Sequence, residues 1–120
     1  MARRYFSYRW SDIMEVGKFT AGEPVVVKAV VAPGQEHEPV PQFVPRDIAE
    51  VQAQIREHKP AAVFAPHVET STGIMLPDDY IRGVAEACEE VGAIFVLDCI
   101  ASGNVWVDMK ATGVVRWHGC

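Results

Sequence analysis

One short segment of the 120-residue chain gathers several side chains that can hydrogen-bond a polar ligand. It runs from His67 to Gly73 with the sequence HVETSTG, and it holds an imidazole, a carboxylate and three hydroxyls before the glycine. Gly73 allows unusual backbone turns, and the residues before it offer donors and acceptors. The same composition also suits a loop that only caps its own backbone, so composition alone leaves both interpretations open.

A second candidate is Asp98, which directly follows the apolar run Ala93–Leu97. A carboxylate at the end of a buried strand loses hydration, and a compensating partner must offset that cost. The partner can be structural, such as an arginine or a helix N-terminus, or it can be a cationic ligand atom. Position alone does not separate these two roles. For Cys99, next to Asp98, a buried thiol is favoured over a reactive one.

Both segments follow predicted strands of an α/β fold. Apolar patterns and Gly or Pro boundaries predict a β-α-β-α-β order, after a short helix at 6–18 and with a loop at Gln35–Pro45. The five elements are Pro24–Val31, Asp47–His58, Ala61–Ala65, Pro77–Val91 and Ala93–Leu97. Strands that are apolar on both faces and alternate with helices indicate a mostly parallel sheet covered on both sides. Ligands gather at the carboxyl ends of such strands, which selects the loops His67–Ile74 and Asp98–Gly103.

Composition narrows the possible partners. A net charge of −5 and a pI of about 5.3 argue against binding to nucleic acid or to an anionic membrane surface. The chain has no long apolar run and no signal-peptide pattern, so we expect no membrane segment. Three cysteines without CxxC spacing predict free thiols in a reducing compartment, the cytoplasm. The histidines lack metal-ligand spacing, no GxGxxG or GxxxxGK[ST] motif occurs, and no GxSxG motif surrounds Ser71.

Taken together, the two loops are similar to those of a known family. The string APHVETSTGIMLP, then a helix, then an apolar strand ending VLDCIAS, resembles the class V pyridoxal-phosphate-dependent aminotransferases, especially the alanine–glyoxylate and serine–pyruvate group. That group carries a His-x-Glu-[Ser/Thr]-Ser-Thr-Gly loop and a Val-Asp-Ser-Val-Ala-Ser strand end. Upstream, FSYRW resembles the family's short helix start, with Ser7 where Gly is usual. Thr70 and Ala101 stand where the cysteine desulfurases of the same fold carry other residues, which favours the transaminase group.

This resemblance implies a partial large domain of fold type I over residues 1–114, with a divergent tail at 115–120 that has no strand. It implies pyridoxal 5'-phosphate as cofactor, amino acid and 2-oxo acid substrates such as glyoxylate or pyruvate, and a homodimer in the full-length family. Asp98 matches the acid that keeps the cofactor's pyridine nitrogen protonated. Thr70 matches the small polar residue near the ring's phenolic oxygen, and Ile100 matches the apolar residue packed on one ring face.

The chain also departs from the family. The lysine that binds the cofactor covalently follows a further strand there, and the glycine-rich phosphate turn and the stacking aromatic lie upstream of the region matching FSYRW. The match ends at Val114, and none of Lys18, Lys28, Lys59 and Lys110 corresponds to that lysine. We therefore expect a gene fragment or a reading-frame disruption after Val114, inactive on its own. The alternatives are a non-catalytic remnant or small binding module, and sulfur abstraction from cysteine on the same fold.

Overall fold

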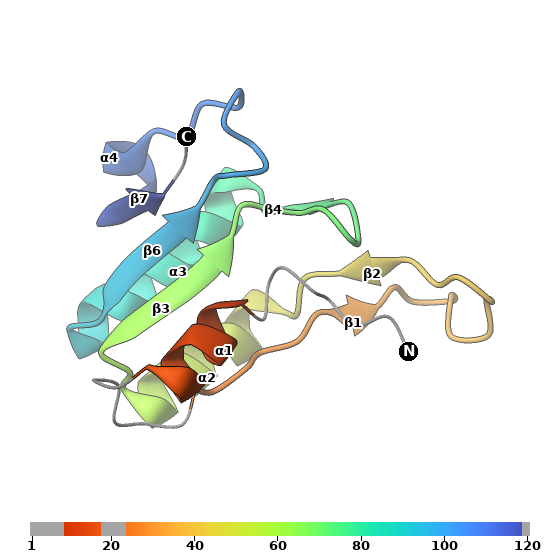
Figure 1. The fold of residues 1–120 in the computed structure, drawn as a ribbon, viewed down its shortest axis with the longest axis horizontal. Coiled ribbons are helices and arrows are strands. Elements are labelled where there is room, and N and C mark those ends of the chain that lie inside the picture. The colour runs from red at the N-terminus through yellow and green to blue at the C-terminus, as the bar shows by residue number, and fades with distance from the viewer. Residues whose placement is uncertain (1–8, 18–23, 119–120) are drawn as a thin grey trace.

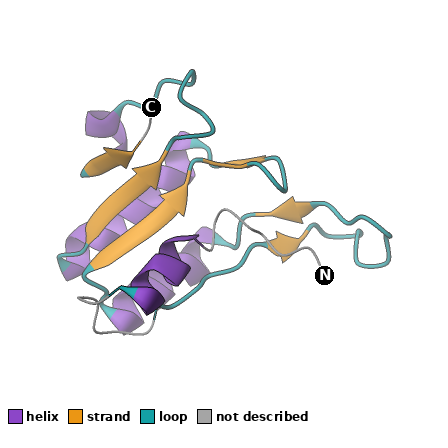
Figure 2. Cartoon of the chain, in the orientation of Figure 1, coloured by secondary structure: helices purple, strands orange, loops and turns teal. Residues whose placement is uncertain are grey.

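A parallel sheet lies at the centre of the computed structural model, which describes residues 9–17 and 24–118 (Figures 1 and 2). Within these residues the sheet has the strand order β3-β6-β7, with β3 spanning Ala62–Pro66, β6 Ile94–Asp98 and β7 Arg116–His118. Both neighbouring pairs are parallel, and the register aligns Pro66 with Asp98. The carboxyl ends of the strands therefore meet at one edge, and the expected α/β fold with parallel strands is confirmed.

Two helices precede the first two strands of this sheet, and both were predicted to within one residue. Helix α2 spans Ile48–His58 and begins at Asp47, whose carboxylate accepts the backbone N–H of Ala49 at 2.9 Å. Helix α3 spans Asp78–Val91 and ends at Gly92. Gly92 has φ of +75°, a conformation that glycine adopts without the steric cost of a Cβ, so the chain turns from α3 directly into β6.

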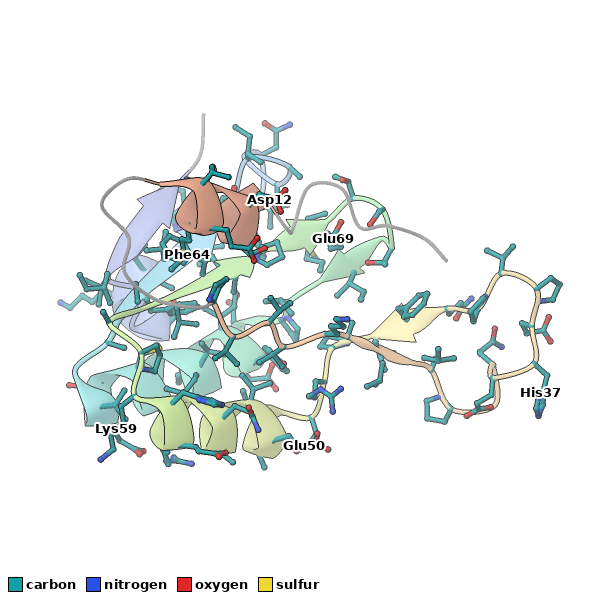
Figure 3. The ribbon with its side chains drawn as sticks, turned by 60° about the horizontal axis from the view of Figure 1, so that its bottom comes forward. Asp12, His37, Glu50, Lys59, Phe64 and Glu69 are labelled. Carbon is teal, nitrogen blue, oxygen red and sulfur yellow. The ribbon has the colours of Figure 1, made fainter. Side chains whose placement is uncertain are left out.

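Helices cover both faces of the sheet, but unequally. Figure 3 shows α2 and α3 on one side and helix α1 (Arg9–Val16) on the other, beside β3. On the α3 side, Phe95 and Leu97 of β6 are fully buried. Gly83 of α3 faces α2, where an added Cβ would lie 2.8 Å from Cγ1 of Ile48. The absence of a side chain at Gly83 therefore sets how closely the two helices pack.

The predicted strand Pro24–Val31 is wrong for most of its length. Only Val30–Val31 forms a strand, β1, and it pairs antiparallel with β2 (Phe43–Val44) inside the predicted loop. β1 and β2 make a two-stranded ladder of their own, and Figures 1 and 3 show it as an arm that extends away from the helices. The valine run favours an extended backbone, but it finds no partner strand in the parallel sheet.

Two further segments differ from expectation. The loop after β3 contains a small antiparallel hairpin, β4 (Val68–Glu69) with β5 (Ile74–Met75). The tail was expected to lack a strand, which is wrong for Arg116–His118, because β6 offers it a second edge for parallel pairing. The short helix α4 (Met109–Thr112) leads into that strand. No helix within the described ranges is long and apolar enough to cross a membrane.

Candidate functional site

The two candidate loops meet at the carboxyl edge of the sheet, as the parallel arrangement predicts. Because β3 and β6 are neighbours and Pro66 aligns with Asp98, each loop begins at the same level of the sheet. The first contact between them is a backbone hydrogen bond, in which the N–H of His67 donates to the carbonyl oxygen of Asp98 at 2.8 Å. The sheet itself therefore fixes the starting points of both loops.

His67 joins the loops a second time through its side chain. Its ring is buried, with 2 % of the residue exposed, and Nδ1 lies 2.7 Å from Oγ of Ser102, which is 5 % exposed. Burial lowers the pKa of His67, while the negative charge of Asp78 and a hydrogen bond with the backbone of Leu76 act in the opposite direction. With a lowered pKa the ring is neutral near pH 7, so it acts as a hydrogen-bonding group and not as a cation.

The hydroxyl-rich loop partly caps itself. The buried carboxylate of Glu69 accepts the backbone N–H of Ser71 at 3.1 Å and its hydroxyl at 2.7 Å. The carbonyl of Glu69 accepts the N–H groups of Thr72 and Gly73, and Gly73 takes φ of +71°. The self-capping interpretation is thus confirmed for Ser71 and Thr72. The side chain of Thr70 is exposed within this turn, which leaves it directed to a ligand or to solvent.

Asp98 is the last residue of β6 and is half-buried. Its Oδ1 accepts the backbone N–H of Ile100 at 3.1 Å, so the carboxylate turns the chain out of the strand. Ile100 itself is 58 % exposed, which is a large exposed fraction for an apolar side chain beside a polar site. Cys99 between them is buried, in agreement with the buried-thiol interpretation.

The structure therefore places Thr70, Asp98 and Ile100 on two loops at one edge of the sheet. Sequence reasoning missed the contact between His67 and Ser102 that ties these loops together. Both residues lie in loops that the sequence had selected, but they are 35 positions apart and nothing local in the sequence links them. A polar residue directly after a buried strand was the only signal that pointed to such a contact.

The lysines of the described chain lie elsewhere. Lys59 ends α2 and precedes β3, so it lies at the opposite end of that strand from the loops; Figure 3 shows it far from Glu69. Lys28 is exposed beside the arm. Lys110 lines a shallow depression between α3 and α4, together with Arg82, Glu86 and Glu89. Within residues 24–118, no lysine follows β3 or β6 directly at the edge where the two loops meet. The same residues contain no cluster of three metal-binding side chains.

Known proteins with related sequences are aminotransferases. No family model matches the chain. Alanine–glyoxylate aminotransferase from Rattus norvegicus is 34% identical over 68 residues, which is 56% of this chain and 16% of the relative. Acetylornithine aminotransferase from Methanosarcina acetivorans is 36% identical over 77 residues, which is 60% of this chain and 20% of the relative. These two names agree on amino-group transfer and differ in substrate.

Solved structures give the same result. Ureidoglycine–glyoxylate aminotransferase from Bacillus subtilis aligns with a TM-score of 0.56 at 29% identity. Alanine–glyoxylate aminotransferase from Nostoc sp. aligns with a TM-score of 0.55 at 33% identity. Each alignment covers 62% of this chain and 19% of the solved chain, so the protein spans only about a fifth of these relatives. Over the part that matches, the chain is similar to aminotransferases, and in particular to alanine–glyoxylate aminotransferases.

Proposed function

We propose that the chain forms part of the pyridoxal-phosphate-binding domain of a transaminase, which moves an amino group between an amino acid and a 2-oxo acid such as glyoxylate or pyruvate. The observation that carries the proposal is the position of Asp98. Its carboxylate stands at the carboxyl end of β6, between β3 and β7, where ligands of parallel sheets bind. The names of the relatives support amino-group transfer over other chemistry.

The residues of the two loops fit the ring of that cofactor. When bound, pyridoxal phosphate supplies an electron sink, which requires a protonated pyridine nitrogen. Asp98 is held by its own strand and by the N–H of Ile100, so its carboxylate is fixed in place to pair with such a cation. Thr70 offers an exposed hydroxyl for the phenolic oxygen. Ile100 offers an exposed apolar side chain that a ring face would cover.

The cofactor's phosphate fits less well to the described residues. Phosphate groups bind where helix N-termini present free N–H groups and positive potential. Here α2 begins at Asp47, α3 carries Asp78 and Asp79 in its first turn, and α4 begins at Asp108. These carboxylates already compensate the helix ends and would repel a phosphate. We therefore assign the ring contacts to the two loops and no phosphate contact to the N-termini of α2, α3 and α4.

We further propose that this chain alone does not catalyse transamination. The reaction needs a lysine that holds the cofactor covalently, and the described lysines do not lie at the edge where the two loops meet. A non-catalytic remnant or small binding module is the second candidate, and the same observation favours it. In the full-length family we expect a homodimer. The buried thiols of Cys88 and Cys99 favour a reducing compartment such as the cytoplasm.

A chimera tests the role of Asp98. Residues 61–114 would replace the matching segment of the Nostoc enzyme. The rate of transamination between alanine and glyoxylate would be measured, and the absorbance spectrum of the bound cofactor would be recorded as well. We expect activity in the chimera and a loss on the order of 100-fold in kcat for Asp98→Asn, because the charge opposite the ring nitrogen is removed. Asp108→Asn is the matched control, since Asp108 also accepts a backbone N–H, but in α4. Equal activities of the two variants would refute the assignment.

A second measurement addresses the 120-residue chain itself. Incubated with pyridoxal phosphate and reduced with borohydride, it should carry no specific adduct at any lysine, and it should convert no alanine and glyoxylate. A stoichiometric adduct at one lysine, located by mass spectrometry, would overturn the proposal that the chain is inactive alone.

A further inference from the structure

His67 makes three hydrogen bonds that the proposed chemistry does not use. Its N–H donates to the carbonyl of Asp98 at 2.8 Å, its own carbonyl accepts the N–H of Leu76 at 2.9 Å, and Nδ1 lies 2.7 Å from Oγ of Ser102. The three partners belong to β6, to the residue after β5, and to the loop after β6. One buried residue thus bonds to three of the segments that border the candidate site.

The side-chain bond has a specific place in the chain. His67 precedes Thr70 by three positions, and Ser102 follows Asp98 by four and Ile100 by two. The N–H of Ser102 also donates to the carbonyl of Cys99 at 3.1 Å, which closes a tight turn around Ile100. The bond between His67 and Ser102 therefore fixes the far end of one loop against the near end of the other.

The geometry points to a positioning pair. We propose that the hydrogen bond between His67 and Ser102 holds the Asp98–Ile100 turn at a fixed distance from the Thr70 turn, so that both turns can contact the same cofactor ring. This inference rests on the proposed function for its purpose, but the geometric claim can be tested without cofactor.

Energetics favour positioning over bulk stability. A neutral hydrogen bond between buried groups changes a folding equilibrium by only about threefold to tenfold. Apolar side chains of similar volume would fill the same space at comparable stability. A hydrogen bond differs from apolar packing in that it demands one distance and one direction. A buried pair with both partners satisfied selects a single arrangement of the two loops.

Four variants of the 120-residue chain test the pair. Ser102→Ala removes the hydroxyl, and His67→Leu removes the ring nitrogen. His67→Asn is the rescue, because the Asn amide branches from Cγ as Nδ1 does and can donate or accept there. Thr112→Val is the matched control: it also removes a buried hydroxyl, which donates to the carbonyl of Asp108 at 2.7 Å, but in α4.

The readouts are amide hydrogen exchange of Ile100, whose N–H reports on the Asp98 carboxylate, and the carboxyl carbon shift of Asp98 by NMR. Ser102→Ala and His67→Leu should speed exchange at Ile100 by about tenfold, since local opening becomes easier. They should also shift the Asp98 signal. In His67→Asn and Thr112→Val, the exchange rate at Ile100 should stay within about twofold of the rate in the unmodified protein. A merely structural role would make Thr112→Val behave like Ser102→Ala, and that result would overturn the proposal.

If Ser102→Ala and His67→Leu fail to fold, the hydrogen bond between His67 and Ser102 can still be tested in the unmodified protein. Nitrogen shifts of the His67 ring should show one neutral tautomer between about pH 7 and about pH 8, because a fixed partner selects which nitrogen carries the proton. If the His67 ring instead exchanges between two tautomers, the proposal of a fixed hydrogen bond between His67 and Ser102 is wrong.

The two proposals fail separately. If exchange at Ile100 responds as expected while Asp98→Asn leaves the chimera active, the pair stands and the cofactor role of Asp98 falls. If Asp98→Asn inactivates the chimera while exchange at Ile100 ignores Ser102→Ala, the cofactor role stands and the pair falls.

Discussion

The carboxyl edge of the sheet and the β1–β2 arm are both built from short extended segments, yet they are held in different ways. At the sheet edge, residues 35 positions apart are bonded and buried, as His67 and Ser102 are. In the arm, pairing stops after two residues on each strand, and Val40 is 86 % exposed. Order at the edge comes from contacts between distant parts of the chain. Order in the arm comes from one short exposed ladder and its turns, without a buried core, so changes in the two regions should have unequal costs.

The largest difference should appear when apolar side chains are truncated. Phe95→Ala should lower the free energy of unfolding by about 3–5 kcal/mol, because it leaves a cavity between β6 and α3. That is enough to unfold much of a small domain. Val40→Ala in the arm should change it by less than about 0.5 kcal/mol. Urea titrations followed by circular dichroism compare the two, and a similar loss for both would contradict the distinction.

An intermediate effect is expected where a glycine is replaced. Gly83→Ala should cost about 1–3 kcal/mol, because its Cβ would lie 2.8 Å from Ile48 and the helices must move apart. Adding Ile48→Val should recover part of the loss. Gly34→Ala in the arm meets no atom within 4 Å, but its φ of +81° costs about 1 kcal/mol. No second-site change should recover that loss, and a steric rescue at Gly34 would show that the arm is packed.

The smallest effect should come from the ion pair between α2 and α3. Arg56 donates to both carboxylate oxygens of Glu90, at 2.6 and 2.9 Å, and this hydrogen bonding lowers the pKa of Glu90. A lowered folded-state pKa stabilises the protein above the ordinary pKa of glutamate, and the contribution disappears as the pH falls through the lowered value. Glu90→Gln should therefore be slightly less stable than the unmodified protein at neutral pH and equal to it in acid. A difference that persists in strong acid would point to packing and not to charge.

The body of the fold could be read from local patterns. Helix α3 was predicted to within one residue because Pro77, Asp78 and Gly92 mark its ends and Ile81, Val84 and Cys88 recur on one face. β3 and β6 were predicted to within one residue because short apolar runs between helices have few other structures available. The arm could not be predicted, since Val25–Val27 indicate an extended chain without indicating a partner.

The candidate site shows the same division. Which loops border the site followed from strand order alone. That Glu69 and Ser71 brace the first loop, while Thr70 is exposed, depends on a turn geometry that five polar side chains can adopt in several ways. β7 was missed because its residues, Arg116–His118, carry no strand pattern of their own, and the open edge of β6 supplies the pairing.

Pro66 has a consequence for whatever approaches the outer edge of β3. The N–H of His67 points toward β6, and successive residues of a strand alternate sides, so the nitrogen of Pro66 faces away from β6. That nitrogen carries no hydrogen. A further strand laid along this edge would find no backbone donor at Pro66. Such a strand would lose one ladder hydrogen bond directly before the HVETSTG loop begins, so Pro66 weakens strand pairing at the point where the chain enters the candidate site.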